Sequence, residues 1–285
     1  MKLALLNKAK TETGKVDLPI QFEEEFRPDL ISRAAWTISM NKKQAYGAFP
    51  MAGKGYSSYV SKRRRAYRGI YGSGTSRTPR KIMSRRGRRL HYVGAFAPMT
   101  VGGRRAHPPK ADKVWDRKIN IKERRKAIRS AISATIMPEV VKERGHNVPK
   151  EYPFVISDEI NKLNKTKDVQ LLLIKLGFEA ELKRTEDRKV RAGKGKARGR
   201  KYKSKTGILI VVGSKCELQK AGRNILGVDV AYVKDLNAEI LAPGGSAGRI
   251  TVWTKSAIDT LGKDKLFMWK WNQKYYYTHC QLKRH

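Results

Sequence analysis

The chain has 285 residues, enough for one sizeable core with extensions, and it carries 63 lysines and arginines against 25 acidic residues, a formal net charge of +38. Self-repulsion on that scale disfavours a compact state unless a polyanion neutralises it, so a nucleic acid is the expected partner and an anionic membrane surface the rival. No run of about 20 apolar residues could span a bilayer, and the apolar run at residues 3–6 is too short for a signal peptide, so we expect no membrane partner and a cytoplasmic location.

Two helices are predicted in the first half of the chain. Over residues 28–41, Pro28 suits a first turn, and one apolar stripe follows, made of Leu30, Ile31, Ala34, Ala35 and Ile38. Over residues 120–137, Asn120 and Glu123 have the spacing of a capping box. The apolar face of this second helix consists of Ile121, Ile128, Ile132 and Ile136.

The segment between these helices is basic and poor in structural signals. Residues 44–110 contain 10 glycines and 5 prolines without a sustained apolar period, and residues 30–111 hold 19 lysines and arginines and no acidic residue. Loops longer than about 15 residues inside a domain are usually functional or disordered. We therefore expect a long basic loop, inserted between two helices, that is disordered alone and ordered on its partner.

The second half alternates strand and helix signals. Apolar runs at residues 154–156, 208–212, 228–233 and 250–253 predict strands, and the segments at 166–176 and 256–261 predict helices. This rhythm predicts an α/β fold, with an open, mainly parallel sheet and flanking helices.

The long loop combines arginines with interleaved aromatic residues. Guanidinium groups pair with phosphates through two hydrogen bonds, and aromatic rings stack on unpaired bases. A solvated tail or an import signal is the alternative interpretation, and the missing carboxylates and the aromatic residues argue against it. The RNA-binding candidates here are Arg63, Arg64, Arg65, Arg68, Tyr71, Arg77, Arg80, Arg85, Arg86, Arg88, Arg89, Arg104, Arg105, His107 and Lys110.

A second basic segment lies at residues 183–205, with 12 lysines and arginines against Glu186 and Asp187. Its glycines lack the spacing of a dinucleotide fingerprint, and no strand precedes them, so we interpret it as a flexible loop that contacts phosphates. Its candidates are Arg191, Lys194, Lys196, Arg198 and Arg200. Further candidates are Lys122, Arg125, Lys126 and Arg129 on the second helix, and Arg249 beside a glycine-rich turn, for which a plain tight turn is an equal interpretation.

No catalytic or metal-binding pattern is visible. The five histidines are scattered, and the sequence Gly213-Ser-Lys lacks the earlier glycine of a phosphate loop. We expect no enzyme activity, no metal or other cofactor and no small-molecule substrate. The aromatic and basic segment at residues 266–277 has two equal interpretations, packing on the core or docking on RNA or a neighbouring protein.

Several longer segments resemble one family. GGRRAHPPK at residues 102–110, INIKERRKAIRSAI at 119–132, RAGKGKARGR at 191–200, NAEILAPGG at 237–245 and GRITVWTKSAI at 248–258 are similar to the archaeal and eukaryotic form of large-subunit ribosomal protein family four. The match covers roughly residues 1–262, and the chain looks archaeal because the long C-terminal extension of eukaryotic members is missing. The segments at 56–89 and beyond residue 262 depart from the family pattern.

This resemblance implies a division of the chain. An α/β core over residues 1–43 and 111–262 is expected at the surface of the large ribosomal subunit, with a loop at 44–110 that penetrates rRNA and reaches the wall of the peptide exit tunnel. Residues 183–205 are expected as a second basic loop, and 263–285 as a tail. The implied partners are large-subunit rRNA and neighbouring ribosomal proteins, and the implied roles are assembly and tunnel shape.

Two other classes of function stay open at this stage. An RNA-modifying enzyme, such as a methyltransferase with a basic arm, should show a glycine-rich loop directly after its first strand, and residues 7–14 do not have that pattern. A DNA-compacting protein should bind duplex DNA as well as folded RNA.

Overall fold

The computed structural model describes residues 1–60, 63–66 and 69–268, and these divide into two compact units. Among the described residues, the core unit comprises Met1–Lys42 and residues 116–268, and the arm unit lies within Lys43–Trp115. Each unit has its own internal packing, so each is described by itself.

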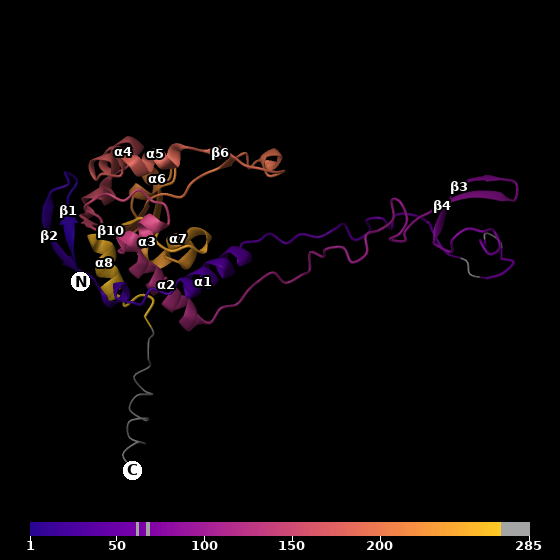
Figure 1. Cartoon of the computed structure of the whole chain (residues 1–285), viewed down its shortest axis with the longest axis horizontal. Helices are drawn as coiled ribbons and strands as arrows, with labels where there is room; N and C mark the ends of the chain where they lie inside the picture. The colour runs from indigo at the N-terminus through magenta and orange to yellow at the C-terminus, as the bar shows by residue number, and fades with distance from the viewer. Residues whose placement is uncertain (61–62, 67–68, 269–285) are drawn as a thin grey trace, which may run out of the picture. The chain divides into compact units, whose positions relative to one another are not determined.

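The core unit is built on a six-stranded sheet in the order β2-β1-β5-β10-β8-β9. Its strands β1, β2 and β10 are labelled in Figure 1. β1 and β2 are antiparallel, and every other neighbouring pair is parallel. The predicted α/β class with a mainly parallel sheet is therefore confirmed. The strands are β1 (Lys2–Leu6), β2 (Glu12–Asp17), β5 (Val155–Ile156), β8 (Leu209–Val212), β9 (Asp229–Tyr232) and β10 (Thr251–Thr254).

Helices cover both faces of this sheet. Asn120 caps α2, since its side-chain oxygen accepts from the backbone N–H of Lys122 at 3.0 Å. The longer helices are α1 (Pro28–Asn41), α2 (Ile121–Thr135), α4 (Thr166–Lys175), α5 (Glu179–Glu186) and α8 (Lys255–Lys263). The short ones are α3 (Pro138–Glu143), α6 (Leu218–Gly222), α7 (Ala238–Leu241), and the 3-10 turns η1 (Ile20–Phe22), η2 (Asp158–Lys162), η3 (Lys196–Arg198), η4 (Val233–Asp235) and η5 (Pro243–Gly245).

The central strand β8 shows how the core is formed. Ile210 and Val212 pack in a cluster that includes Leu173 of α4, whereas Leu209 and Val211 pack in a second cluster that includes Ile132 of α2. Successive side chains of a strand point to opposite faces, so an uninterrupted apolar run is what a strand buried on both faces requires. The three apolar clusters of the core unit draw all their residues from 1–42 and 116–268.

The core unit also joins the two chain segments that lead to the arm unit. The side chain of Asn41 accepts from the backbone N–H of Arg117 at 2.7 Å and donates to the Arg117 carbonyl at 3.1 Å. The guanidinium of Arg117 also lies over the ring of Trp36, 5.9 Å from its centroid. These contacts hold the end of α1 beside the segment that precedes α2.

The arm unit contains a β-hairpin that the sequence interpretation missed. β3 (Arg80–Arg86) and β4 (Arg89–Gly94) pair antiparallel, and Gly87, with φ of 56°, opens the two-residue turn between them. The expectation of a segment without regular structure is therefore wrong for residues 80–94. Outside the hairpin, the two halves of the arm unit run side by side. At Gly53 the backbones are so close that an added Cβ would lie 2.6 Å from the Cα of Arg104, so this position requires glycine.

The second basic segment also carries regular structure. Its first residues, 183–186, belong to α5, and it continues as a small hairpin of β6 (Lys189–Val190) and β7 (Tyr202–Lys203). After α8, Leu266 and Phe267 pack against the core cluster around Trp253. The rest of the predicted aromatic tail, residues 269–285, lies outside the described residues.

Candidate nucleic-acid interface

Four arginine side chains surround the turn at the end of the β3–β4 hairpin. Arg85, Arg86, Arg88 and Arg89 are all exposed, and the Nε of Arg85 donates to the Gly87 carbonyl at 2.9 Å. No acidic residue occurs between residues 30 and 111, so no carboxylate of this segment competes for these guanidinium groups. Exposed guanidinium groups of this kind are suited to paired hydrogen bonds with phosphate oxygens.

Several predicted arginines already contact aromatic rings within the arm unit. Tyr71 is flanked by Arg64 and Arg77, whose guanidinium carbons lie 4.9 and 4.4 Å from its ring centroid. A hydrogen bond from Arg64, at 3.3 Å, and the charge of Arg77 lower the pKa of the Tyr71 hydroxyl. Arg80 lies over Tyr92, 5.7 Å from its centroid. These cation–π contacts hold the guanidinium groups in fixed directions.

The remaining predicted residues of the arm unit are mostly at its surface. Arg63, Arg65, Arg105, His107 and Lys110 are exposed. Arg104 is half-buried over the ring of Phe96, 5.1 Å from its centroid. Arg68 lies outside the described residues.

The β6–β7 hairpin of the core unit presents a second group of cations. The backbone N–H of Arg191 donates to the Lys201 carbonyl at 2.8 Å, and Gly199, with φ of 76°, supports the return of the chain. The predicted residues Arg191, Lys194, Lys196, Arg198 and Arg200 are all exposed. Because they surround one short turn, a single phosphate-rich backbone could contact several of them together.

The predicted RNA-binding residues on α2 differ in how far their side chains are engaged in contacts within the core unit. Lys122 is exposed at the start of the helix. Arg125 donates to the Met268 carbonyl at 3.3 Å, and Lys126 lies 3.7 Å from Glu24. Arg129 donates to Glu24 at 2.6 Å and to the Phe267 carbonyl at 2.7 Å, and its side chain is 15% exposed. Arg129 therefore fixes neighbouring segments on α2 and offers little surface to RNA.

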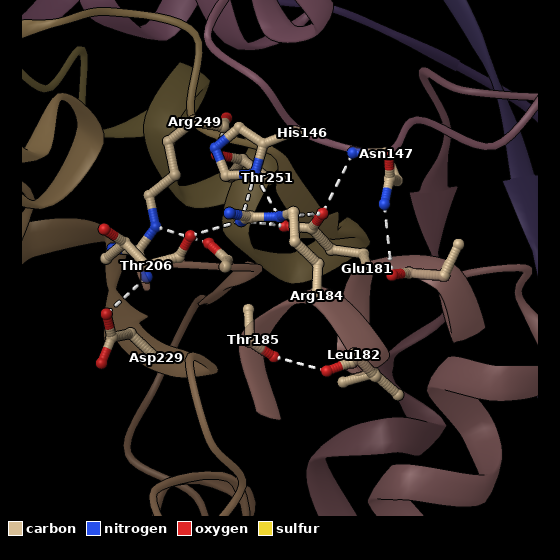
Figure 2. Close-up of polar contacts among 12 residues, drawn as sticks. His146, Asn147, Glu181, Leu182, Arg184, Thr185, Thr206, Asp229, Arg249 and Thr251 are labelled. Carbon is tan, nitrogen blue, oxygen red and sulfur yellow. Dashed lines mark hydrogen bonds and ion pairs between the residues drawn. The ribbon is translucent and has the colours of Figure 1, made fainter. Parts of the chain in front are cut away.

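Arg249 is a correction to the predicted interface. It is 1% exposed, and it donates to the carbonyls of Gly207, at 2.9 Å, and Ile240, at 3.0 Å. It also donates to the carboxylate of Asp229 (Figure 2). Its guanidinium thus joins α7, β9 and the residue two positions before β8 inside the core unit. A phosphate has no access to a side chain so enclosed, and Arg249 is structural.

A buried polar cluster near Arg249 was not predicted (Figure 2). Arg184 of α5 donates to both carboxylate oxygens of Glu181, at 2.7 and 2.9 Å, and Nδ1 of His146 lies 2.7 Å from Oε1. Burial alone would raise the pKa of Glu181, but hydrogen bonds from Arg184, His146 and the Asn147 backbone outweigh it and lower that pKa to about 2. The sequence alone did not predict this cluster, because His146 and Asn147 lie more than 30 positions before Glu181 and meet it only in the folded chain.

Within residues 1–60, 63–66 and 69–268, no group of three or more histidine, cysteine or acidic side chains could hold a metal ion. No helix among these residues is both long and apolar enough to cross a membrane.

Comparison with known proteins agrees with this picture. The model of the ribosomal protein L4/L1 family matches residues 16–264. The chain is 48% identical to the large ribosomal subunit protein uL4 of Nanoarchaeum equitans, over 94% of this chain and 100% of that one. It is 44% identical to the protein of the same name from Archaeoglobus fulgidus, over 92% and 99% of the two chains, and 45% identical to that from Methanocaldococcus jannaschii, over 92% and 98%.

Proposed function

Because the chain belongs to the ribosomal protein L4/L1 family, in its archaeal form, we propose that its exposed arginines bind large-subunit rRNA. The protein is a structural constituent of the large ribosomal subunit, in the cytoplasm, and is not an enzyme. The proposal concerns which of its surfaces meet the RNA.

The observation that supports the proposal most is the composition of the arm unit, which has many exposed arginines and a single acidic residue, Asp112. A segment with a single carboxylate near one end enters a phosphate-lined crevice with little repulsion between like charges, and the release of counterions favours its binding. We propose that the arm unit is the part of the chain that penetrates rRNA and contributes to the wall of the peptide exit tunnel. The β6–β7 hairpin and Lys122 are the proposed RNA contacts of the core unit.

The test is co-sedimentation from a native lysate. The protein should travel with large subunits at low salt and dissociate only at high salt, because counterion release makes such complexes salt-sensitive. Dimethyl sulfate and hydroxyl-radical footprints on the rRNA of these particles should show protection that disappears when the protein is removed. Sedimentation of the protein apart from large subunits at low salt would contradict the proposal.

A further inference from the structure

A cavity of about 710 Å³ in the core unit belongs to neither basic hairpin. It lies where the start of α1, the end of α3, residues 204–206 and residues 245–247 meet. Its volume falls in the range of small-ligand sites, roughly 300–1,000 Å³. Its lining includes Arg144, Arg184, Lys205 and His146, with Glu143 as its acidic residue.

Arg144 has no carboxylate partner within ion-pair distance in the described part of the chain. Its guanidinium donates only to backbone carbonyls, to Pro243 at 2.7 Å and to Ala247 at 3.4 Å. Burial, together with the nearby charges of Arg249 and Arg184, lowers the pKa of Arg144 to about 10. A half-buried cation without a counter-charge is costly, and a bound anion would remove that cost.

The other cations of the cavity differ in how far they are neutralised. Arg184 is paired with the buried carboxylate of Glu181. Lys205 lies 2.8 Å from Asp187, in a pair that is open to solvent and therefore weak. The cations available to an incoming anion are thus Arg144 and Lys205.

His146 supplies an independent observation. The residue lines the cavity and is 6% exposed, and its Nε2 is buried without a hydrogen-bond partner in the described structure. Its other ring nitrogen, Nδ1, lies 2.7 Å from Glu181 and 3.2 Å from a guanidinium nitrogen of Arg184, so Nε2 is the ring nitrogen whose hydrogen-bonding capacity is unused in the described structure. Buried polar atoms are nearly always hydrogen-bonded, and one that is not calls for a ligand or a water.

We propose that this cavity binds one nucleotide of RNA, with the phosphate on Arg144 and Lys205 and a polar group of the nucleotide on His146. A phosphate oxygen can accept from a protonated Nε2, and a ribose hydroxyl can donate to a bare one, so RNA satisfies this atom in either state. The choice of RNA over free phosphate rests on the proposed function. The site would give the core unit a further RNA contact, at the base of the second basic segment, which supplies Arg184 and Lys205 to its lining.

The experiment uses the full chain and reads His146 directly. The imidazole signals are followed by ¹H–¹⁵N NMR, with His146 assigned by elimination through glutamine variants of the other four histidines, at positions 91, 107, 279 and 285. The probes are a single-stranded RNA of mixed sequence, the DNA of the same sequence, and inorganic phosphate at equal phosphate concentration. RNA should shift the His146 signals, and DNA and inorganic phosphate should shift them less.

The double variant Arg144→Gln/Lys205→Gln should abolish that shift. It should also reduce the slope of log affinity against log salt by roughly 1.4, or 0.7 for each lost contact to a single strand. The matched control, Lys167→Gln/Lys175→Gln, removes the same charge from exposed positions of α4 and should leave both readouts unchanged. If the double variant is unstable, Lys205→Gln alone, which alters only a partly exposed pair, should reduce the slope by about 0.7.

The outcomes separate this site from the wider function. If the chain binds RNA but the His146 signals stay in place, and both double variants bind equally, the cavity site is wrong and the proposed function stands. If inorganic phosphate shifts His146 as strongly as RNA does, the cavity is a free-anion site and the nucleotide assignment falls. If the chain binds no RNA, the proposed function and this inference both fail.

Discussion

Glu181 is a fully buried carboxylate that stays ionised because three groups donate to it, the guanidinium of Arg184, the ring of His146 and the backbone N–H of Asn147. Their combined effect exceeds the cost of burial, so the pKa of Glu181 falls from an ordinary 4.5 to about 2. A carboxyl group with a lowered pKa in the folded state stabilises the fold above its ordinary pKa. That contribution is lost progressively as the pH falls from about 4.5 towards 2.

We therefore expect Glu181→Gln to lower the free energy of unfolding at pH 7 by about 3 kcal/mol, because Arg184 loses a buried counter-charge and His146 loses an ionised hydrogen-bond partner. The variant should also lose part of the pH dependence of stability between pH 4.5 and 2, measured by chemical denaturation at several pH values. Glu179→Gln is the matched control, since Glu179 pairs with Lys183 on the same helix at the surface and should matter little. Equal losses in the two variants would contradict this account.

At single residues, the sequence showed which side chains could bind phosphate, but it did not show which of them are buried. Arg249 and Arg86 look alike in the sequence, yet Arg249 is buried and bonded to Gly207 before β8, to α7 and to β9, whereas Arg86 is exposed beside a turn. Burial follows from which strand neighbours which, and no local pattern around Arg249 encodes that. Arg129 shows the same limit, because its partner Glu24 lies more than 100 positions earlier in the chain.

At the scale of elements, sequence patterns predicted the helices α1, α2, α4 and α8 and the strands β5, β8, β9 and β10, but not α3, α5, α6 or α7. The stripe from Leu30 to Ile38 became α1, and the apolar run before Gly213 became β8. The β3–β4 hairpin was missed because arginines dominate it and hide its alternation. Leu90 and Tyr92 are half-buried, whereas Arg89, His91 and Val93 are exposed, which is the period of two that a strand requires.

The hairpin yields a prediction about RNA affinity. Arg86→Gln/Arg88→Gln/Arg89→Gln should reduce the slope of log affinity for rRNA against log salt by roughly 2 to 3, at 0.7–0.9 for each phosphate contact. Filter binding at several salt concentrations measures this slope. Replacing three exposed lysines of the core unit, Lys162, Lys167 and Lys175, removes the same charge and serves as the control. If the two triple variants lose the same slope, only net charge matters and the hairpin has no special role.

At the scale of the whole chain, two properties of the core unit bear on the role of the arm unit. The apolar clusters of the core unit are complete within residues 1–42 and 116–268. The two hydrogen bonds between Asn41 and Arg117 already bring together the chain segments that lead to residues 43–115. A short linker can therefore join residues on either side of the arm, and the entropic cost of closing a loop changes by only about 0.6 kcal/mol per doubling of its length.

Replacing residues 46–108 with a short Gly/Ser linker should leave a soluble core unit that melts cooperatively, since no apolar residue of its clusters is removed. Calorimetry and circular dichroism measure this. The shortened protein keeps the β6–β7 hairpin and Lys122, so it should still enter large subunits, although more weakly, and the particles should assemble slowly or handle nascent chains differently. A core that unfolds would show that the arm unit is part of the fold. Normal affinity together with normal particles would show that the most basic segment of the chain is not its RNA-binding arm.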